Sequence, residues 1–166
     1  MILVYEHASN SSLDNYLGYT NKSTNLTWVQ RIKICIDIAR GLNYLHTRVE
    51  DEQRIVHRDI KSGNILLGKN WVAKIADFGL SRFHHKNEQA KTLYTENVAG
   101  TKEYLCPEYM KTGRLKRAID IYSSGLFYLR SCPGSLPMIQ LTLRRMNTEL
   151  HMLHDDVLKR IQYVKW

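Results

Sequence analysis

The chain has 166 residues, a formal net charge of +8, 43% hydrophobic residues and 24% charged residues, values that are ordinary for one soluble globular domain. No apolar run reaches the roughly 18 residues that a membrane-spanning helix needs, which excludes an evident membrane segment. Lysine and arginine are scattered and aromatic residues do not alternate with them, so we expect no nucleic-acid partner.

The first third of the chain predicts a strand and two helices. Residues 2–5 predict a short buried strand, and apolar residues at 13, 16 and 17 predict a short helix after a polar turn. Thr27-Trp28-Val29-Gln30 has the pattern of a capping box, in which the Thr hydroxyl and the Gln side chain each serve a free backbone N–H. Apolar residues at steps of three and four then predict a helix to about Thr47. Gly41 inside this helix indicates close packing, because Gly costs about 1 kcal/mol relative to Ala there.

The rest of the chain alternates short elements with loops. Residues 54–57, 64–67 and 71–76 predict short strands, with a turn at 68–70. The polar stretch 81–97 shows little pattern. Pro107 predicts the start of a short helix, and a second apolar helix begins near Ala118.

Three polar residues stand out as a group that could handle phosphate. Asp59 and Asn64 are close in sequence, and Asp77 follows before Phe78-Gly79. Two carboxylates and an amide are hard oxygen ligands suited to Mg²⁺. Lys61, between Asp59 and Asn64, could place a positive charge on a phosphate. These residue types predict phosphoryl transfer.

Five motifs in the same order and spacing extend this reading to a family. H-R-D-I-K-S-G-N-I-L-L at 57–67 and A-D-F-G-L-S-R at 76–82 resemble the catalytic loop and metal-binding motif of protein kinases. L-V-Y-E-H-A-S-N-S-S-L-D-N-Y-L at 3–17 resembles the hinge and the helix after it. V-A-G-T-K-E-Y-L-C-P-E-Y at 98–109 and D-I-Y-S-S-G at 120–125 resemble the substrate-binding segment with its A-P-E motif and the start of the next large helix. The chain is thereby identified as a member of the protein kinase family, most similar to plant receptor-like kinases.

The resemblance implies an α+β, protein-kinase-like fold of which the mainly helical lower lobe is present. Residues 1–125 resemble a partial kinase domain that starts at the hinge, and residues 126–166 are a divergent tail, so later helices are expected to be truncated or replaced. No G-x-G-x-x-G occurs in the chain, and the strand with the V-A-I-K lysine and the helix with its partner glutamate are not found. We therefore expect the upper lobe to be missing.

The family also implies roles for residues of the transfer site. Asp59 would orient the substrate hydroxyl and take its proton, Lys61 would contact the γ-phosphate, and Thr101 would support this pair. Asn64 and Asp77 would hold Mg²⁺. Lys61 and Thr101 are features of Ser/Thr kinases rather than Tyr kinases. The residues expected to line the ATP site on the adenine side are Glu6, Ala8, Ser12 and Leu66.

Further residues are implied to support or regulate this site. Arg58 would bind a phosphate on the activation loop, for which Thr92, Tyr94 and Thr95 are candidates, although unmodified surface residues remain the alternative. Asp120 would brace the backbone of the catalytic loop, and His57 would pack near the metal-binding segment.

The function implied is that of an ATP- and Mg²⁺-dependent Ser/Thr protein kinase of the receptor-like signalling type, acting on a protein substrate. Three cysteines without zinc-type spacing favour reduced thiols in an intracellular protein. The resemblance implies a cytoplasmic location, although relatives are often anchored in the plasma membrane. Two alternatives stay open: an inactive kinase-derived fragment that acts as a binding or regulatory module, and a truncated gene product. We expect the isolated chain to be inactive, because the parts that cover ATP are absent.

The resemblance stops abruptly after Gly125. Plant kinases of this type continue roughly as G-V-V-L-F-E-V-L-S-G-K-L-A-Y-D, whereas this chain reads G-L-F-Y-L-R-S-C-P-G-S-L-P-M-I. Codons can be chosen for the sequence of this chain so that one nucleotide, restored after the Gly125 codon, makes the same DNA encode the family sequence. We therefore expect a shifted reading frame over 126–166, with simple divergence as the alternative, and the gene's nucleotide sequence distinguishes the two.

Overall fold

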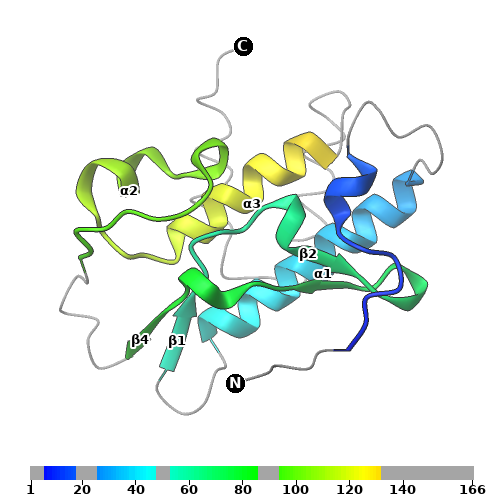
Figure 1. Ribbon diagram of the computed structural model, residues 1–166, viewed down its shortest axis with the longest axis horizontal. Coiled ribbons are helices and arrows are strands. Elements are labelled where there is room, and N and C mark those ends of the chain that lie inside the picture. Colours follow the sequence, from blue (N-terminus) through cyan, green and yellow to red (C-terminus); the bar gives the residue numbers. More distant parts are fainter. Residues whose placement is uncertain (1–5, 18–25, 48–52, 86–93, 132–166) are drawn as a thin grey trace.

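A computed structural model describes residues 6–17, 26–47, 53–85 and 94–131 (Figure 1). The strand predicted at 2–5, the candidate Thr92 and the chain beyond residue 131 lie outside these ranges. The described residues form an α+β arrangement of three α-helices, four short strands and several 3₁₀ turns.

Helix α1 (Trp28–Thr47) is the central element of the main core. Its predicted capping box is confirmed, since Thr27 N donates to Gln30 Oε1 at 2.8 Å and Gln30 N donates to Thr27 Oγ1 at 3.3 Å. Gly41 is closely approached as predicted, because a Cβ there would lie 3.0 Å from Ile75 Cδ1. Six buried residues of the helix lie on the predicted stripe, namely Ile34, Cys35, Ile38, Ala39, Leu42 and Leu45, whereas the buried His46 was not predicted.

Two antiparallel two-stranded sheets flank α1. Strand β2 (Ile65–Leu67) pairs with β3 (Ala73–Ile75), and both correspond to predicted strands. Strand β1 (Gln53–Val56) was also predicted, but its partner β4 (Arg82–His85) was not. The stretch 81–97 therefore begins with a strand that its polar sequence did not indicate.

The predicted helices near Pro107 and Ala118 are confirmed as α2 (Pro107–Thr112) and α3 (Ala118–Ser131). Figure 1 shows α3 running alongside α1, and the two helices are in contact. Helix α3 passes through Gly125 without a break, and Tyr128 is buried in the main core, where its hydroxyl donates to Cys35 O at 3.5 Å. The boundary predicted at residue 125 thus falls within a helix, and the origin of the sequence beyond it stays a prediction.

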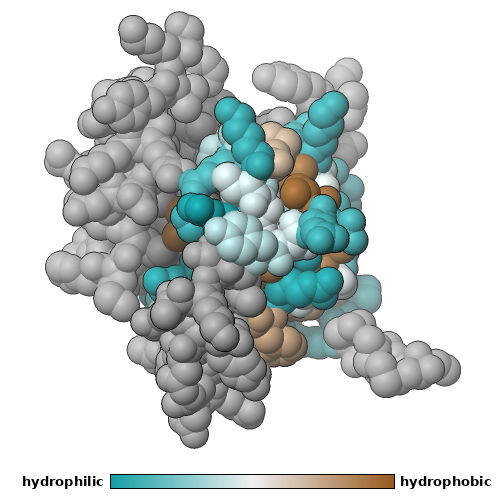
Figure 2. Space-filling view, turned by 90° about the vertical axis from the view of Figure 1, so that its left-hand side faces the viewer, coloured by the Kyte–Doolittle hydropathy of each residue, from teal (hydrophilic) through white to brown (hydrophobic). Residues whose placement is uncertain are grey.

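A second apolar cluster joins β1 to α2 and α3. Its buried members are Val56, Cys106, Tyr109, Leu115 and Ile119. Figure 2 faces the end that carries α2 and β4, and the coloured part of this surface is mostly teal to white with smaller brown areas. Among the described helices, none is both long and apolar enough to cross a bilayer.

Candidate active site

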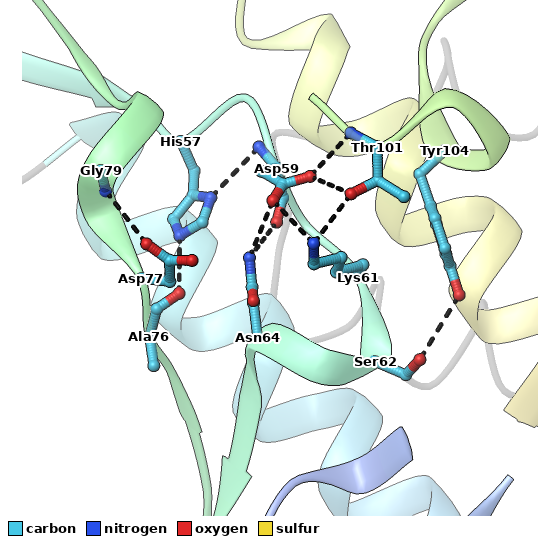
Figure 3. Close-up of polar contacts among 10 residues, drawn as sticks. All are labelled: His57, Asp59, Lys61, Ser62, Asn64, Ala76, Asp77, Gly79, Thr101 and Tyr104. Atoms are coloured by element: carbon cyan, nitrogen blue, oxygen red, sulfur yellow. Dashed lines mark hydrogen bonds and ion pairs between the residues drawn. The ribbon is translucent and has the colours of Figure 1, made fainter. Parts of the chain in front are cut away.

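The loop after β1 brings Asp59, Lys61 and Thr101 together (Figure 3). Asp59 Oδ1 accepts hydrogen bonds from Thr101 N at 2.9 Å and from Thr101 Oγ1 at 2.7 Å. Lys61 Nζ lies 3.1 Å from Asp59 Oδ2 and donates to Thr101 Oγ1 at 2.9 Å. The threonine hydroxyl therefore links the carboxylate and the ammonium across 42 residues of sequence.

This network keeps the Asp59 carboxyl ionised. Burial raises the pKa of Asp59, but the hydrogen bonds from Thr101 and Lys61, with the Lys61 charge, outweigh burial and lower the pKa below its ordinary value of 3.8. At neutral pH the site thus presents a buried carboxylate beside a half-buried ammonium.

Gly100 allows the segment before Thr101 to approach the catalytic loop. Its φ is +136°, and a Cβ at this position would lie 2.7 Å from Arg58 O and 2.8 Å from Leu105 Cδ2. Only glycine meets both conditions without displacing its neighbours.

Asn64 and Asp77 come from adjacent segments. The β2–β3 register pairs Ile65 with Ile75, and Ala76 N donates to Asn64 O at 2.9 Å. Asn64 Nδ2 donates to Asp59 O at 2.9 Å and to Asp59 Oδ2 at 3.1 Å. Asp77 is exposed, has a left-handed backbone (φ 64°), and its Oδ1 accepts from Gly79 N at 3.3 Å.

These two residues fit a magnesium ion that also takes phosphate oxygens. Because Asn64 Nδ2 donates to Asp59, the Oδ1 atom of Asn64 remains for a metal ion, and no described residue donates to this oxygen. The described residues contain no group of three His, Cys, Asp or Glu side chains that could hold a metal alone. Mg²⁺ is commonly bound by one or two protein ligands with nucleotide phosphates completing its shell, so this sparse set matches that cation.

A buried carboxylate fixes the backbone of the loop from behind. Asp120 accepts from His57 N and Arg58 N, each at 2.8 Å, which confirms that it braces the catalytic loop. His46 Nε2 lies 2.8 Å from Asp120 Oδ2, a contact that the sequence did not predict. His57 packs near the segment that carries Asp77, as expected, with Nε2 3.0 Å from Ala76 O and its ring centroid 4.9 Å from that of Phe78.

The sequence also missed a link from the catalytic loop to the 3₁₀ turn Leu13–Tyr16. Buried Ser62 donates through Oγ to Asp14 Oδ1 at 2.5 Å and lies 3.5 Å from Tyr104 Oη. No periodic or motif signal marks such contacts, because their partners are 48 and 42 residues away.

Arg58 uses its guanidinium within the protein. It is 3% exposed, and it donates to Leu80 O at 3.2 Å, to Asn97 O at 2.9 Å and twice to Tyr109 Oη at 2.9 and 2.6 Å. A phosphate could reach Arg58 only after some of these bonds were broken. Its predicted role as a phosphate receptor therefore stays a prediction that this arrangement does not favour.

The candidate adenine-side residues lie along one segment and the strand beside it. Ser12 and Leu66 form an isolated antiparallel β-bridge, and Ser11 N donates to Ala8 O at 3.1 Å. The turn at residues 8–12 is therefore fixed against β2. Glu6 is exposed and forms a close ion pair with Lys74, whose hydrogen bond and charge lower the pKa of Glu6.

The two described candidates for phosphorylation differ in exposure. Tyr94 is 60% exposed, with Arg114 over its ring, so its hydroxyl can be reached. Thr95 is half-buried; its N–H donates to Gly113 O at 2.9 Å and its hydroxyl to Asn97 O at 3.1 Å.

Comparison with known proteins agrees with this geometry. The protein kinase domain family matches residues 1–163. In Arabidopsis thaliana, a probable receptor-like protein kinase is 46% identical over 129 residues, which are 78% of this chain and 15% of the relative. L-type lectin-domain containing receptor kinase IV.2 is 37% identical over 164 residues, 99% of this chain and 22% of the relative. A probable receptor-like serine/threonine-protein kinase is 42% identical over 139 residues, 82% of this chain and 30% of the relative.

The chain belongs to the protein kinase family. Its sequence is that of a plant receptor-like kinase catalytic domain, as the motifs predicted. It spans less than a third of the length of these three relatives.

Proposed function

We propose that this chain supplies the transfer site of an ATP- and Mg²⁺-dependent protein Ser/Thr kinase. The observation that carries the proposal is the Asp59–Thr101–Lys61 network, which holds a carboxylate and an ammonium side by side. Phosphoryl transfer needs an oriented acceptor hydroxyl and positive charge on the transferred group, and these two side chains would supply both.

In this proposal Asp59 accepts a hydrogen bond from the substrate hydroxyl and then its proton, while Lys61 contacts the γ-phosphate. Asn64 and Asp77 would hold Mg²⁺, which when bound offsets the negative charge of the phosphates. The turn at residues 8–12, together with Leu66, would face the nucleotide base. The acceptor is a serine or threonine of a protein, as the name of one relative suggests.

The location proposed is the cytoplasm, in line with relatives that are named receptor kinases. We also propose that residues 1–125 act as the kinase portion and that residues 126–166 derive from a shifted frame.

The activity test joins the upper lobe of a receptor-like kinase ahead of residue 1, because the 166 residues contain no G-x-G-x-x-G loop to cover ATP. We expect the chain alone to transfer no labelled phosphate and the fusion to phosphorylate a generic protein substrate. Asp59→Asn in the fusion should reduce transfer by at least about 100-fold, since it removes the proton acceptor.

Asp37→Asn is the matched control, because Asp37 lies in α1 and accepts from Ala73 N at 3.1 Å, away from the network. Equal transfer by the Asp59→Asn and Asp37→Asn fusions would contradict the assigned role of Asp59.

A further inference from the structure

Arg54, in β1, and Arg117, just before α3, each lie two residues before a member of the second apolar cluster, Val56 and Ile119 respectively. Val56 packs with Ile119 in the second apolar cluster, so β1 turns the face carrying Val56 toward α3. Side chains two residues apart in a strand share a face, which places Arg54 on the same side as Val56. Arg117 directly precedes α3, and its carbonyl accepts from Ile121 N at 3.2 Å.

The charge of these two guanidinium groups is not balanced within the described part of the chain. Arg54 Nε is buried without a hydrogen-bond partner, and His46 Nδ1 is the other described side-chain atom of this kind. The ion pairs among the described residues involve neither arginine. Arg117 is largely exposed, yet the protein packed around it lowers the pKa of its guanidinium, and the charge of Arg54 lowers that pKa further.

An oxyanion bound between Arg54 and Arg117 would give Arg54 Nε a hydrogen-bond partner and would offset the repulsion between the two positive charges. A buried donor without a partner is costly, and two adjacent like charges repel. Guanidinium groups present fixed forks of N–H donors that match phosphate and carboxylate geometry. Two positive charges suit a phosphate monoester, which carries about −1.5 to −2 at neutral pH, better than the single charge of a carboxylate.

We propose that Arg54 and Arg117 form a binding site for a phosphate monoester, separate from the transfer site. Arg58 is the arginine that the sequence predicts to bind phosphate, but its guanidinium donates hydrogen bonds to Leu80 O, Asn97 O and Tyr109 Oη. By contrast, Arg54 Nε has no hydrogen-bond partner, and neither Arg54 nor Arg117 takes part in an ion pair among the described residues. The ligand of this site is inorganic phosphate or a phosphorylated side chain of a protein, which share the same oxyanion.

The test is isothermal titration calorimetry of the full 166-residue chain without ATP or Mg²⁺, at constant ionic strength. One arm titrates inorganic phosphate, and the other titrates N-acetyl-O-phosphoserine amide against its unphosphorylated form. We expect saturable binding that Arg54→Gln and Arg117→Gln each weaken at least tenfold. Arg114→Gln is the matched control, because Arg114 lies over the Tyr94 ring, and it should bind as the wild-type chain does.

Phosphate bound at Lys61 would be insensitive to either substitution, so the variants separate the two sites. Binding of the phosphoserine amide alone supports a phosphorylated side chain as ligand, and equal binding in both arms supports a site for the oxyanion itself. No saturable binding by the wild-type chain overturns the proposal, as does unchanged affinity in Arg117→Gln, an exposed change whose fold circular dichroism can verify. Because no phosphate is transferred in this assay, its failure would leave the proposed kinase activity unaffected.

Discussion

Asp59 shows how opposing effects on one carboxyl are decided by its neighbours. Burial alone would favour the protonated form, but a backbone N–H, a hydroxyl and an ammonium all stabilise the charged form. Among the described contacts, the Thr101 hydroxyl binds both partners: it donates to Asp59, and it accepts from Lys61 Nζ at 2.9 Å. The protonation state of Asp59 therefore depends on Thr101 as well as on its ion pair.

Replacing Thr101 by Val should raise the pKa of Asp59. The change keeps the shape of the side chain and the backbone N–H bond, but it removes the hydroxyl donor while burial persists. Carbon-detected NMR titration of the Asp59 carboxyl measures the pKa directly. Thr112→Val is the control, because its hydroxyl donates to Glu108 O in an exposed position and should leave Asp59 unchanged.

The same substitution should destabilise the chain in a pH-dependent way. A carboxyl whose folded pKa is depressed stabilises the fold above its ordinary pKa of 3.8, and this contribution is lost as pH falls through the lower folded value. Thr101→Val should thus cost about 1.5–3 kcal/mol at neutral pH, the range for hydrogen bonds to charged groups, and less below about pH 3.8. A penalty that did not vary with pH would show that Asp59 is not the group involved.

At the scale of elements, helix α1 begins where its local sequence dictates. Thr27 and Gln30 exchange hydrogen bonds at its first turn, so two backbone N–H groups that the helix leaves free are satisfied. Such a cap acts independently of the core that the helix buries.

Thr27→Ala should lower the free energy of unfolding by about 1 kcal/mol, because it removes the hydroxyl that accepts from Gln30 N. Urea unfolding followed by circular dichroism measures this change. Thr47→Ala makes the same substitution at the other end of α1, where the hydroxyl donates to Asn43 O at 2.5 Å, and it should cost less than about 0.5 kcal/mol. Equal losses at both ends would argue against the capping box.

Local signals account for which elements the sequence predicted. Helix α1 has a cap and a regular apolar stripe, and β2 has the continuous apolar run Ile65-Leu66-Leu67. Strand β4 reads Arg-Phe-His-His, in which a single apolar residue gives no alternating pattern, and it forms a strand because β1 pairs with it. Pairing across nearly 30 residues is a tertiary effect that periodicity within one segment cannot report.

The site was predictable in its motifs and less so in its connections. Asp59, Lys61, Asn64 and Thr101 were found because their spacing matches a family, and the structure brings these four together. His46 was missed because its partner Asp120 lies 74 residues away and a single buried histidine carries no pattern. Arg58 was expected to face a loop phosphate, whereas backbone carbonyls and Tyr109 occupy its donors.

At the scale of the whole molecule, Asp120 connects three parts of the fold. It lies in α3, and its carboxylate is fully buried, contacting His46 of α1 and the backbone N–H groups of His57 and Arg58 in the catalytic loop. The position of Asp59 therefore depends on how α1 and α3 pack against each other.

Asp120→Asn should destabilise the whole chain by roughly 3 kcal/mol, because an amide offers one oxygen where the carboxylate offers two acceptors. In either orientation the NH₂ group meets a donor: Arg58 N on one side, or His57 N and His46 Nε2 on the other. Urea unfolding measures the loss, and hydrogen exchange at the His57 and Arg58 amides should accelerate with it. Asp37→Asn, which retains an acceptor for Ala73 N, should change stability by less than about 1 kcal/mol. If both variants unfolded at the same urea concentration, Asp120 would not be the connection between the helices and the loop. If only Asp120→Asn lost stability, the helical core behind the catalytic loop would be what holds this loop in place.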